Sequence, residues 1–289
     1  MLPGMTGKAR IAVVGAGNFG TALAKALKKV GFPIEAVIGR SGRTSTRARA
    51  LARDVGARVP AGSFQELRAE VVWLCVPDSE IAVAARSLAD KMKWKGRIAF
   101  HSSGALSSDE LAALRARGAA VASVHPMMTF VRGSRPALVG VPFAIEGDVK
   151  AVRTARRIVR DLGGEVFLIS KRQKAAYHAW GTFASPLLTA LLATTERVAG
   201  LAGVNAGAAR RRMIPILMQT LANYREFGAA EAFSGPIVRG DVETVRRHLQ
   251  VLKSDEVLGV YVALARAALR YLPTKNKAGL RRVLDGAKG

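Results

Sequence analysis

The sequence predicts a two-part α/β protein, in which a doubly wound, mostly parallel sheet is followed by an all-helical domain. In the first part, short apolar runs of strand length alternate with segments of helical periodicity, which is typical of a parallel sheet with helices on both faces. From residue 171 onward only helical patterns are found. A chain of 289 residues is also long for one hydrophobic core. We therefore expect one domain over residues 1–170 and a second over residues 171–289.

The strands expected in the first domain are separated by helical segments and by loops. In chain order, strands are expected at residues 10–14, 34–40, 71–76, 97–101, 121–124, 142–145 and 165–169, with a shorter one near 57–59. Helices are expected from residue 21, around 46–54, at 80–91 and at 149–162, with a brief helical turn near 63–67. Because the carboxyl ends of parallel strands meet at one edge of a sheet, residues that follow these strands are candidates for a shared site.

The second domain is predicted to contain four long helices, at about residues 172–199, 206–227, 242–252 and 256–271. Asp241 is a suitable N-cap for the third of them. Pro186 lies within the first and should bend it, because proline removes one backbone hydrogen bond. The longest apolar stretch, residues 179–193, is shorter than the ~20 residues that a bilayer requires. We interpret it as a buried helix.

The first strand leads directly into a glycine motif, Gly15-Ala16-Gly17-Asn18-Phe19-Gly20, which a helix follows. In a G-x-G-x-x-G motif the first glycine makes a tight turn and the second lets the backbone approach a pyrophosphate. The third lets the helix pack closely against the sheet. The start of the helix adds free N–H groups and the positive end of its dipole. We therefore predict a dinucleotide site, with a tight turn that binds no ligand as the alternative.

The residues after the second strand bear on which dinucleotide is bound. An acidic residue at this position would favour NAD, because it binds the ribose hydroxyls, and the sequence has none there. It has Arg40, Ser41 and Arg43 instead, whose guanidinium and hydroxyl groups suit a 2′-phosphate. We therefore expect NADP as the cofactor. The alternative is that the two arginines are ordinary surface residues.

The strand at residues 71–76 ends in Cys75 and Val76, and Pro77 then turns the chain into a helix. These three residues are expected to pack near the cofactor, because the carboxyl ends of the strands line the ligand crevice. Cys75 is equally typical of a small buried residue.

Two later strands bring a histidine to the same edge. His101 is followed by Ser102 and Ser103, and His125 ends the next strand. Neither histidine has a cysteine or carboxylate at zinc-ligand spacing, so no metal site is expected. The G-x-S-x-G elbow of hydrolases is also absent. We expect Ser102, Ser103 and His125 to orient a substrate, with histidines that serve the fold alone as the alternative.

The first helix of the second domain begins with Lys174-Ala-Ala-Tyr177-His178. Lys174 and His178 are four residues apart and therefore share a helix face. Reduction of a carbonyl or imine needs a proton donor beside the nicotinamide, because hydride reaches carbon while a proton reaches oxygen or nitrogen. We predict Lys174 and His178 as the donor and its partner. The alternative is a solvated lysine next to a half-buried histidine.

The composition narrows the partners and the setting. The net charge is +24, yet basic residues outnumber acidic ones to a similar extent in residues 1–150 (22 against 11) and in residues 151–289 (23 against 10). This even distribution argues against a specific nucleic-acid surface and predicts only weak, salt-sensitive binding to polyanions. The single cysteine excludes an internal disulfide, and no leader peptide is apparent. We expect a cytoplasmic protein with no membrane partner.

Four stretches of the sequence carry a resemblance to known proteins. They are the glycine motif, His101-Ser-Ser-Gly-Ala-Leu106, His125-Pro-Met-Met-Thr-Phe130, and Tyr177-His178 together with residues 235–241. The chain resembles the superfamily of 6-phosphogluconate dehydrogenase, ketopantoate reductase and pyrroline-5-carboxylate reductase. Within it, the chain is most similar to Rossmann-like proteins whose helical C-terminal domain has no known function. The resemblance implies a Rossmann domain that binds NADP, reductase activity, and a homodimer with the helical domains in contact.

In 6-phosphogluconate dehydrogenase-like enzymes the corresponding helix begins with the pattern K-x-x-x-N. Lys174 matches the lysine, but His178 replaces the asparagine, and Pro186 stands where the similar branch has another asparagine. Our leading hypothesis is an NADP-dependent oxidoreductase that reduces a small carbonyl or imine compound held between the two domains. The alternatives are a non-catalytic NADP-binding sensor or scaffold, and a polyanion-binding protein that has kept the fold.

Overall fold

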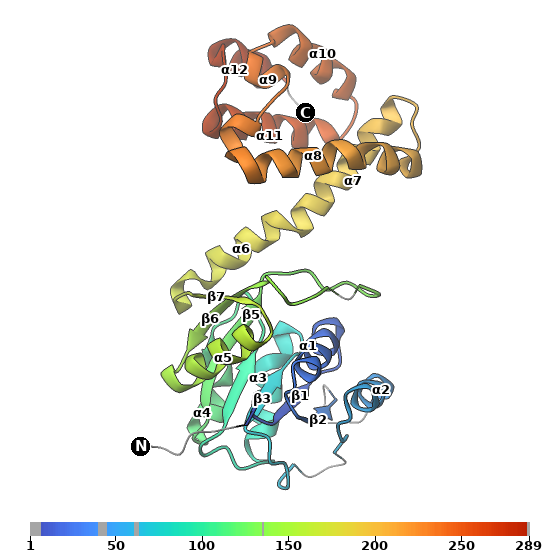
Figure 1. Ribbon diagram of the computed structural model, residues 1–289. Coiled ribbons are helices and arrows are strands. Elements are labelled where there is room, and N and C mark those ends of the chain that lie inside the picture. Colours follow the sequence, from blue (N-terminus) through green and yellow to red (C-terminus); the bar gives the residue numbers. More distant parts are fainter. Residues whose placement is uncertain (1–6, 40–44, 61–63, 135, 288–289) are drawn as a thin grey trace. The chain divides into compact units, whose positions relative to one another are not determined.

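The computed structural model describes residues 7–39, 45–60, 64–134 and 136–287. The chain divides into two compact units, residues 1–185 and 186–289 (Figure 1). The domain boundary that the sequence predicts, near Ser170, lies one helix earlier on the chain and stays a prediction.

The first unit is built on a seven-stranded sheet with the order β2-β1-β3-β4-β5-β6-β7. Its strands are β1 Ile11–Val14, β2 Ile34–Ile38, β3 Val71–Leu74, β4 Ile98–His101, β5 Ala120–Pro126, β6 Pro142–Gly147 and β7 Glu165–Leu168. Neighbouring strands pair in parallel except β5 and β6, which are antiparallel. The mostly parallel sheet is therefore confirmed. The short strand expected near residues 57–59 is reduced to a bridge between Ala36 and Arg58.

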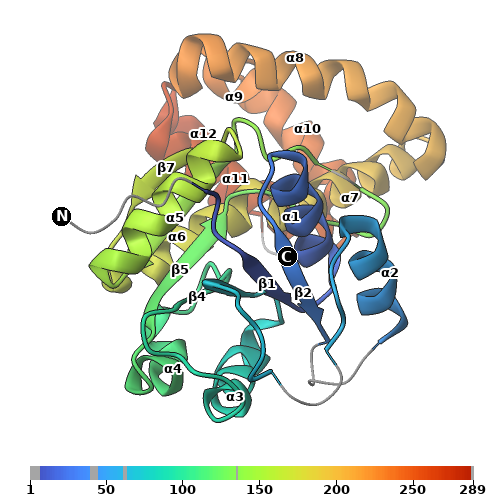
Figure 2. The same cartoon turned by 60° about the horizontal axis from the view of Figure 1, so that its bottom comes forward.

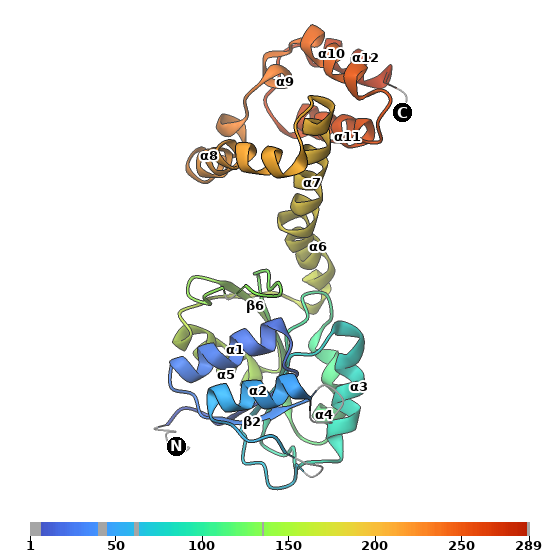
Figure 3. The same cartoon turned by 90° about the vertical axis from the view of Figure 1, so that its right-hand side faces the viewer.

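Helices cover both faces of the sheet because successive strand residues point to opposite sides, and both sides are apolar. Ile11 and Val13 face a core shared with α1 (Asn18–Lys29), α2 (Thr46–Val55) and α5 (Val149–Asp161). Ala12 and Val14 face a second core shared with α3 (Asp78–Ala89), the short 3-10 helix η1 (Ser108–Leu111) and α4 (Ala112–Ala116). Figure 2 shows α3 and α4 apart from α1 and α2, with the strands between them, and Figure 3 shows α3 apart from α1. The doubly wound arrangement follows from this burial of both faces.

The second unit is helical throughout its described residues, as the sequence predicts. Its helices are α7 Pro186–Leu201, α8 Ala206–Ala232, α9 Pro236–Arg239, α10 Val242–Leu252, α11 Val257–Tyr271 and α12 Lys277–Asp285. The last four surround a small core that includes Leu249, Leu258 and Leu280. The expected N-cap is present, because Asp241 accepts a hydrogen bond from the backbone N–H of Thr244. Helix α12 was not predicted.

The helix predicted over residues 172–199 is divided in the structure. A short 3-10 helix, η2 (Lys171–Gln173), leads into α6 (Lys174–Ala184), and α7 begins afresh at Pro186. Ser185, between α6 and α7, leaves the helical conformation with φ −131° and ψ −77°. Proline disfavours helical geometry in the residue that precedes it, so the expected bend is a complete helix end.

Helices α7 and α8 contain almost no buried residues. No residue of α7 is buried, and Ala209 is the one buried residue of α8. Large apolar side chains on these helices are exposed instead, namely Leu187, Leu188, Val198, Leu201, Ile214, Ile216, Met218, Leu221, Tyr224 and Phe227. We call this set the α7–α8 apolar surface. No single helix in the described ranges is long and apolar enough to cross a membrane, although one sharply bent pair, residues 171–201 and 206–239, passes that test when the two are taken together.

Candidate functional site

The residues that the sequence proposes for a site gather at one edge of the sheet. The glycine motif follows β1, Cys75 to Pro77 follow β3, Ser102 and Ser103 follow β4, and His125 lies near the end of β5. These four strands are parallel neighbours, so their carboxyl ends open on the same side. This shared edge is the candidate site.

The glycine turn at this edge leaves no room for side chains at two of its positions. Gly15 has φ +100°, and a Cβ there would lie 2.5 Å from the carbonyl oxygen of Cys75 and 3.2 Å from Cγ1 of Val76. A Cβ on Gly20 would overlap the carbonyl oxygen of Gly15. A Cβ on Gly17 would meet nothing within 4 Å. The turn is thus tightly packed at Gly15 and Gly20. It is open at Gly17, where a ligand could approach the backbone.

Helix α1 begins directly at this turn, and Gly17, its N-cap, has no side chain to bind the first N–H groups. Such groups bind anions readily, aided by the helix dipole. Thr21 is the first residue whose N–H is used in the helix, since it donates to the carbonyl of Gly17. A pyrophosphate therefore fits the open side of the turn in both charge and space.

The segment after β5 reaches the start of α1. The Asn18 side-chain amide donates to the carbonyl oxygen of Phe130 at 3.0 Å, and the rings of Phe19 and Phe130 meet edge to face with their centroids 5.0 Å apart. Ala16 packs against the neighbouring core. The motif from His125 to Phe130, which carries part of the family resemblance, therefore contacts the glycine motif through its last residue.

The residues expected to bind a 2′-phosphate, Arg40, Ser41 and Arg43, lie outside the described residues. Strand β2 ends at Ile38, just before them, and the Gly15 N–H donates to the carbonyl oxygen of Ile38 at 2.8 Å. Their role stays a prediction.

The two serines after β4 are both engaged. Ser102 accepts a hydrogen bond from the indole N–H of the buried Trp73 at 2.8 Å. The Ser103 hydroxyl donates to Asp78 at 2.8 Å and accepts from the N–H groups of Ala105 and Leu106. Ser103 is buried, whereas Ser102 is partly exposed. Ser103 therefore shapes the turn, and Ser102 is the serine that a ligand could reach.

His101 serves the fold. It is fully buried, its Nε2 lies 3.0 Å from the carbonyl oxygen of Ser107, and its Nδ1 accepts the N–H of Ser103 at 3.1 Å. The contact with the carbonyl requires a proton on Nε2, and the contact with the amide requires a bare Nδ1. Burial lowers the pKa of His101 to about 4, so the ring stays neutral. This matches the structural alternative that the sequence left open for this residue.

Lys174 lies at the start of α6 and is buried, with 2% of the residue exposed. Its ammonium donates to the carbonyl oxygen of Ser103 and to the Ser123 hydroxyl, both at 2.6 Å. Burial lowers the pKa of Lys174 to about 8, although the carboxylates of Glu146 and Asp78 oppose the shift. The lysine therefore links the turn after β4 to a residue of β5. The alternative of a solvated lysine is wrong, because Lys174 is buried. His178, the other member of the predicted pair, is exposed.

Tyr177 is not among the site residues that the sequence predicts. Its hydroxyl lies 2.6 Å from Nδ1 of His125, and the two rings meet edge to face. Tyr177 is buried, and desolvation raises its pKa to about 12. Desolvation, with the charges of Lys174, His178 and His101, lowers the pKa of His125 to about 3. Both partners are therefore neutral near pH 7.

Gly104 lies within contact distance of both His125 and His178. A Cβ at this position would lie 2.7 Å from Cδ2 of His178 and 3.0 Å from Cε1 and Nε2 of His125. The two imidazoles, whose centroids are 6.4 Å apart, thus converge over the Gly104 backbone. The structure brings His125 and His178 together above this glycine and places Lys174 behind them, against Ser103 and Ser123.

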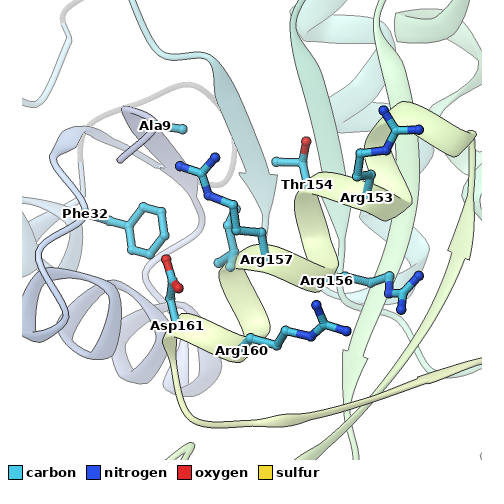
Figure 4. Close-up of a pocket in the computed structure, with 9 residues that line it drawn as sticks. Ala9, Phe32, Arg153, Thr154, Arg156, Arg157, Arg160 and Asp161 are labelled. Atoms are coloured by element: carbon cyan, nitrogen blue, oxygen red, sulfur yellow. The ribbon is translucent and has the colours of Figure 1, made fainter. Parts of the chain in front are cut away.

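A separate cavity of about 510 Å³ lies beside α5 and contains none of the predicted site residues. Figure 4 shows its lining: Arg153, Arg156, Arg157 and Arg160 extend from α5, and Ala9 and Phe32 come from the segments before β1 and β2. It therefore adjoins the amino ends of the strands, away from the candidate site. Basic residues are spread evenly between the two halves of the sequence, but these four arginines lie together on one helix.

Two family models match this chain. Residues 5–126 match the Rossmann-like domain, and residues 141–268 match a domain of unknown function, DUF2520. The chain joins a Rossmann-like domain to a DUF2520 domain. This is the pairing that the sequence resemblance implied. The DUF2520 region begins within the sheet, before β6, and includes α6 with Lys174 and Tyr177.

The fold is shared with solved structures over nearly the whole Rossmann–DUF2520 chain. A Bacteroides fragilis protein described as a candidate NADP oxidoreductase is 23% identical, with a TM-score of 0.74, over 90% of this chain and 97% of its own. An Aspergillus terreus reductive aminase, solved with NADPH and ethyl-5-oxohexanoate, is 17% identical, with a TM-score of 0.63, over 95% and 99%. A Coxiella burnetii pyrroline-5-carboxylate reductase is 14% identical, with a TM-score of 0.60, over 98% and 100%. At these identities the likeness shows a common fold. No curated protein sequence matches the chain.

Proposed function

We propose that this protein is an NADP-dependent reductase of a small carbonyl or imine compound. One observation carries the proposal: a glycine turn open to a pyrophosphate and a cluster of neutral proton donors lie at the same edge of one sheet. A dinucleotide-binding turn alone would fit a sensor equally well. The adjacent His125 and Tyr177 supply what reduction requires besides hydride.

The cofactor would be held by the residues that the motif assigns. Gly15, Gly17 and Gly20 would receive the pyrophosphate at the start of α1, and Arg40 with Arg43 would bind the 2′-phosphate. When bound, the reduced nicotinamide supplies a hydride to an electrophilic carbon. The names of the similar structures, an NADP oxidoreductase and a reductive aminase solved with NADPH, support this choice.

The chain's own residues would orient the substrate and provide its proton. Ser102 is partly exposed at the edge and can hydrogen-bond to a ligand, while His125 presents its ring above Gly104. Lys174 acts here as a positioning cation rather than as the donor that its sequence pattern suggests, because its ammonium is already bound to Ser103 and Ser123. His178 would close the cluster from the exposed side.

We also propose a homodimer, on the strength of the α7–α8 apolar surface. Two helices that bury a single alanine between them leave an apolar area that is unusual for a monomer. A second copy would cover this surface symmetrically. Ile216 is 68% exposed, so Ile216→Glu should yield monomers in light scattering at micromolar concentration. A native protein that is itself monomeric there contradicts the proposal.

The cofactor choice is tested by titration. Charge-assisted contacts to a phosphate contribute about 1.5–3 kcal/mol, so NADPH should bind at least about tenfold more tightly than NADH. Arg40→Asp should reduce this difference, while Arg86→Asp, on the exposed face of α3, should leave it unchanged. Equal affinities of the native protein for the two cofactors exclude the 2′-phosphate site.

A non-catalytic NADP-binding sensor or scaffold is the second candidate, because His178 replaces the asparagine of the K-x-x-x-N pattern. The two are separated by a screen of carbonyl and imine compounds for NADPH consumption. Tight NADPH binding without turnover of any compound favours the sensor.

A further inference from the structure

We propose that Tyr177 and His125 form a proton relay that ends on the oxygen of a carbonyl substrate. The relay rests on the proposed reductase function and names the substrate class of the same site. It starts from the 2.6 Å contact between the Tyr177 hydroxyl and Nδ1 of His125.

The direction of this hydrogen bond follows from the burial of the tyrosine. The residue is 6% exposed, and its hydroxyl has no second partner among the residues that the structure describes. If Nδ1 carried the proton, the buried phenol would accept it and its own O–H would have no acceptor, which costs about 1–3 kcal/mol. The phenol therefore donates to Nδ1.

The tautomer of His125 follows in turn. With Nδ1 as an acceptor, the neutral ring carries its proton on Nε2. This nitrogen lies beside the Gly104 backbone, since a Cβ there would be 3.0 Å from it, and His125 as a whole is partly exposed. Phe167 and Trp180 pack against the Tyr177 ring, with centroids 5.8 and 6.3 Å away, and so hold the phenol in place. The site thus presents a fixed N–H donor at the carboxyl edge of the sheet.

Burial, with the groups around His125, keeps this donor neutral. His101 faces it from β4, and Lys174 and His178 face it from α6, each disfavouring a second proton on the ring. The carboxylates nearby are engaged elsewhere: Asp78 accepts from Ser103, and Glu146 accepts from the N–H and hydroxyl of Ser108. The ring therefore keeps a single proton through the neutral range.

The proton transfer balances with a hydride from the reduced nicotinamide. As the carbonyl carbon receives hydride, its oxygen takes the proton from Nε2 of His125. Nδ1 takes the proton of the Tyr177 hydroxyl, so the imidazole ends neutral with its proton on the other nitrogen. A proton from water then returns to Nε2 while Nδ1 gives its proton back to the phenolate, so both residues regain their starting state and the carbonyl compound has become an alcohol.

The same geometry favours a carbonyl over an iminium ion. An iminium nitrogen has no lone pair to accept the Nε2 proton and needs no donor for its reduction. It would also place a cation against an N–H dipole and near the buried ammonium of Lys174. A carbonyl oxygen, which becomes negative as hydride arrives, is stabilised by both.

The tautomer is measured first, by ¹⁵N NMR of protein labelled in its histidines, with His125→Asn to assign the signals. We expect a protonated Nε2 and a bare Nδ1 at pH 7, and a mixture of tautomers in Tyr177→Phe. A protonated Nδ1 in the native protein overturns the relay. This measurement needs neither cofactor nor substrate, so its result is independent of the proposed function.

Turnover is measured second, with cyclohexanone and the permanently charged 2-methyl-3,4-dihydroisoquinolinium as probes and NADPH as reductant. Tyr177→Phe should lower ketone turnover about 10²-fold without changing NADPH affinity. The matched control is Tyr261→Phe, since the Tyr261 hydroxyl lies 3.0 Å from Nδ1 of His248 in the second unit. Reduction of the iminium with no reduction of the ketone, or a Tyr177→Phe variant as active as the native protein, overturns the proposal. Failure to bind NADPH would instead refute the reductase function.

Discussion

Lys174→Met tests the buried charge at the centre of the site. In the folded chain the pKa of Lys174 falls from its ordinary value of 10.5 to about 8 because the ammonium is desolvated. At 1.36 kcal/mol per unit, the folded state is penalised by about 3 kcal/mol wherever the lysine is charged in both states. Above pH 8 the folded lysine loses its proton while the unfolded one keeps it. The free energy of unfolding should therefore rise by up to about 3 kcal/mol between pH 8 and 10.5.

The difference between the native protein and Lys174→Met isolates this contribution from the other titrating groups. Urea unfolding followed by tryptophan fluorescence suits the measurement, because Trp73, Trp94 and Trp180 all lie in the first unit with Lys174. Methionine should remove the rise, whereas Lys93→Met, at an exposed position, should keep it. A difference that is flat from pH 7 to 10.5 would show that Lys174 is not held as a buried cation.

Three further changes probe other parts of the molecule. Gly20→Ala should abolish NADPH binding and lower stability by several kcal/mol, since its Cβ overlaps the Gly15 carbonyl oxygen; unchanged NADPH affinity in titration would contradict the close packing. Gly104→Ala should displace the His125 imidazole and lower turnover at least about tenfold, whereas Gly181→Ala, with open space at its Cβ, should not; equal rates in the two variants would remove His125 from the reaction. Replacing Arg156 and Arg160 by Glu should weaken RNA binding at low salt at least about tenfold in filter binding; unchanged binding would place the basic surface elsewhere.

The sheet could be predicted closely because most of its strands are buried on both faces and read as short apolar runs between turns, although the edge strand β7 is partly exposed. The adjacency of the glycine turn, Cys75 and Ser102 follows from parallel pairing alone. Other features depend on interactions that sequence patterns do not record. Helix α12 is short and follows a loop, so its amphipathic pattern was too brief to stand out. The sequence predicts a bend at Pro186, but the complete helix end found there depends on the conformation of Ser185.

The roles within the site could be predicted only in part. Lys174 follows exposed basic residues and has the appearance of a solvated lysine, yet the rotation of α6 against β5 turns it inward. The same rotation brings Tyr177 onto His125, and no sequence spacing relates two residues on different elements. Ser123 was within reach of the sequence, because it lies two residues before His125 on the same strand and therefore on the same face.

The contact between Asn18 and Phe130 makes the segment from His125 to Phe130 a connection of fixed length between β5 and α1. One end carries the His125 imidazole, and the other is fixed to the first turn of α1. Five peptide steps can reach no further than roughly 17 Å, so the number of residues between these ends limits how far the His125 end can lie from the anchor on α1. An inserted or deleted residue in this segment would shift both the His125 imidazole and the contacts of Phe130 with α1. The length of this segment, more than its side chains, should therefore be what any redesign of the site has to preserve.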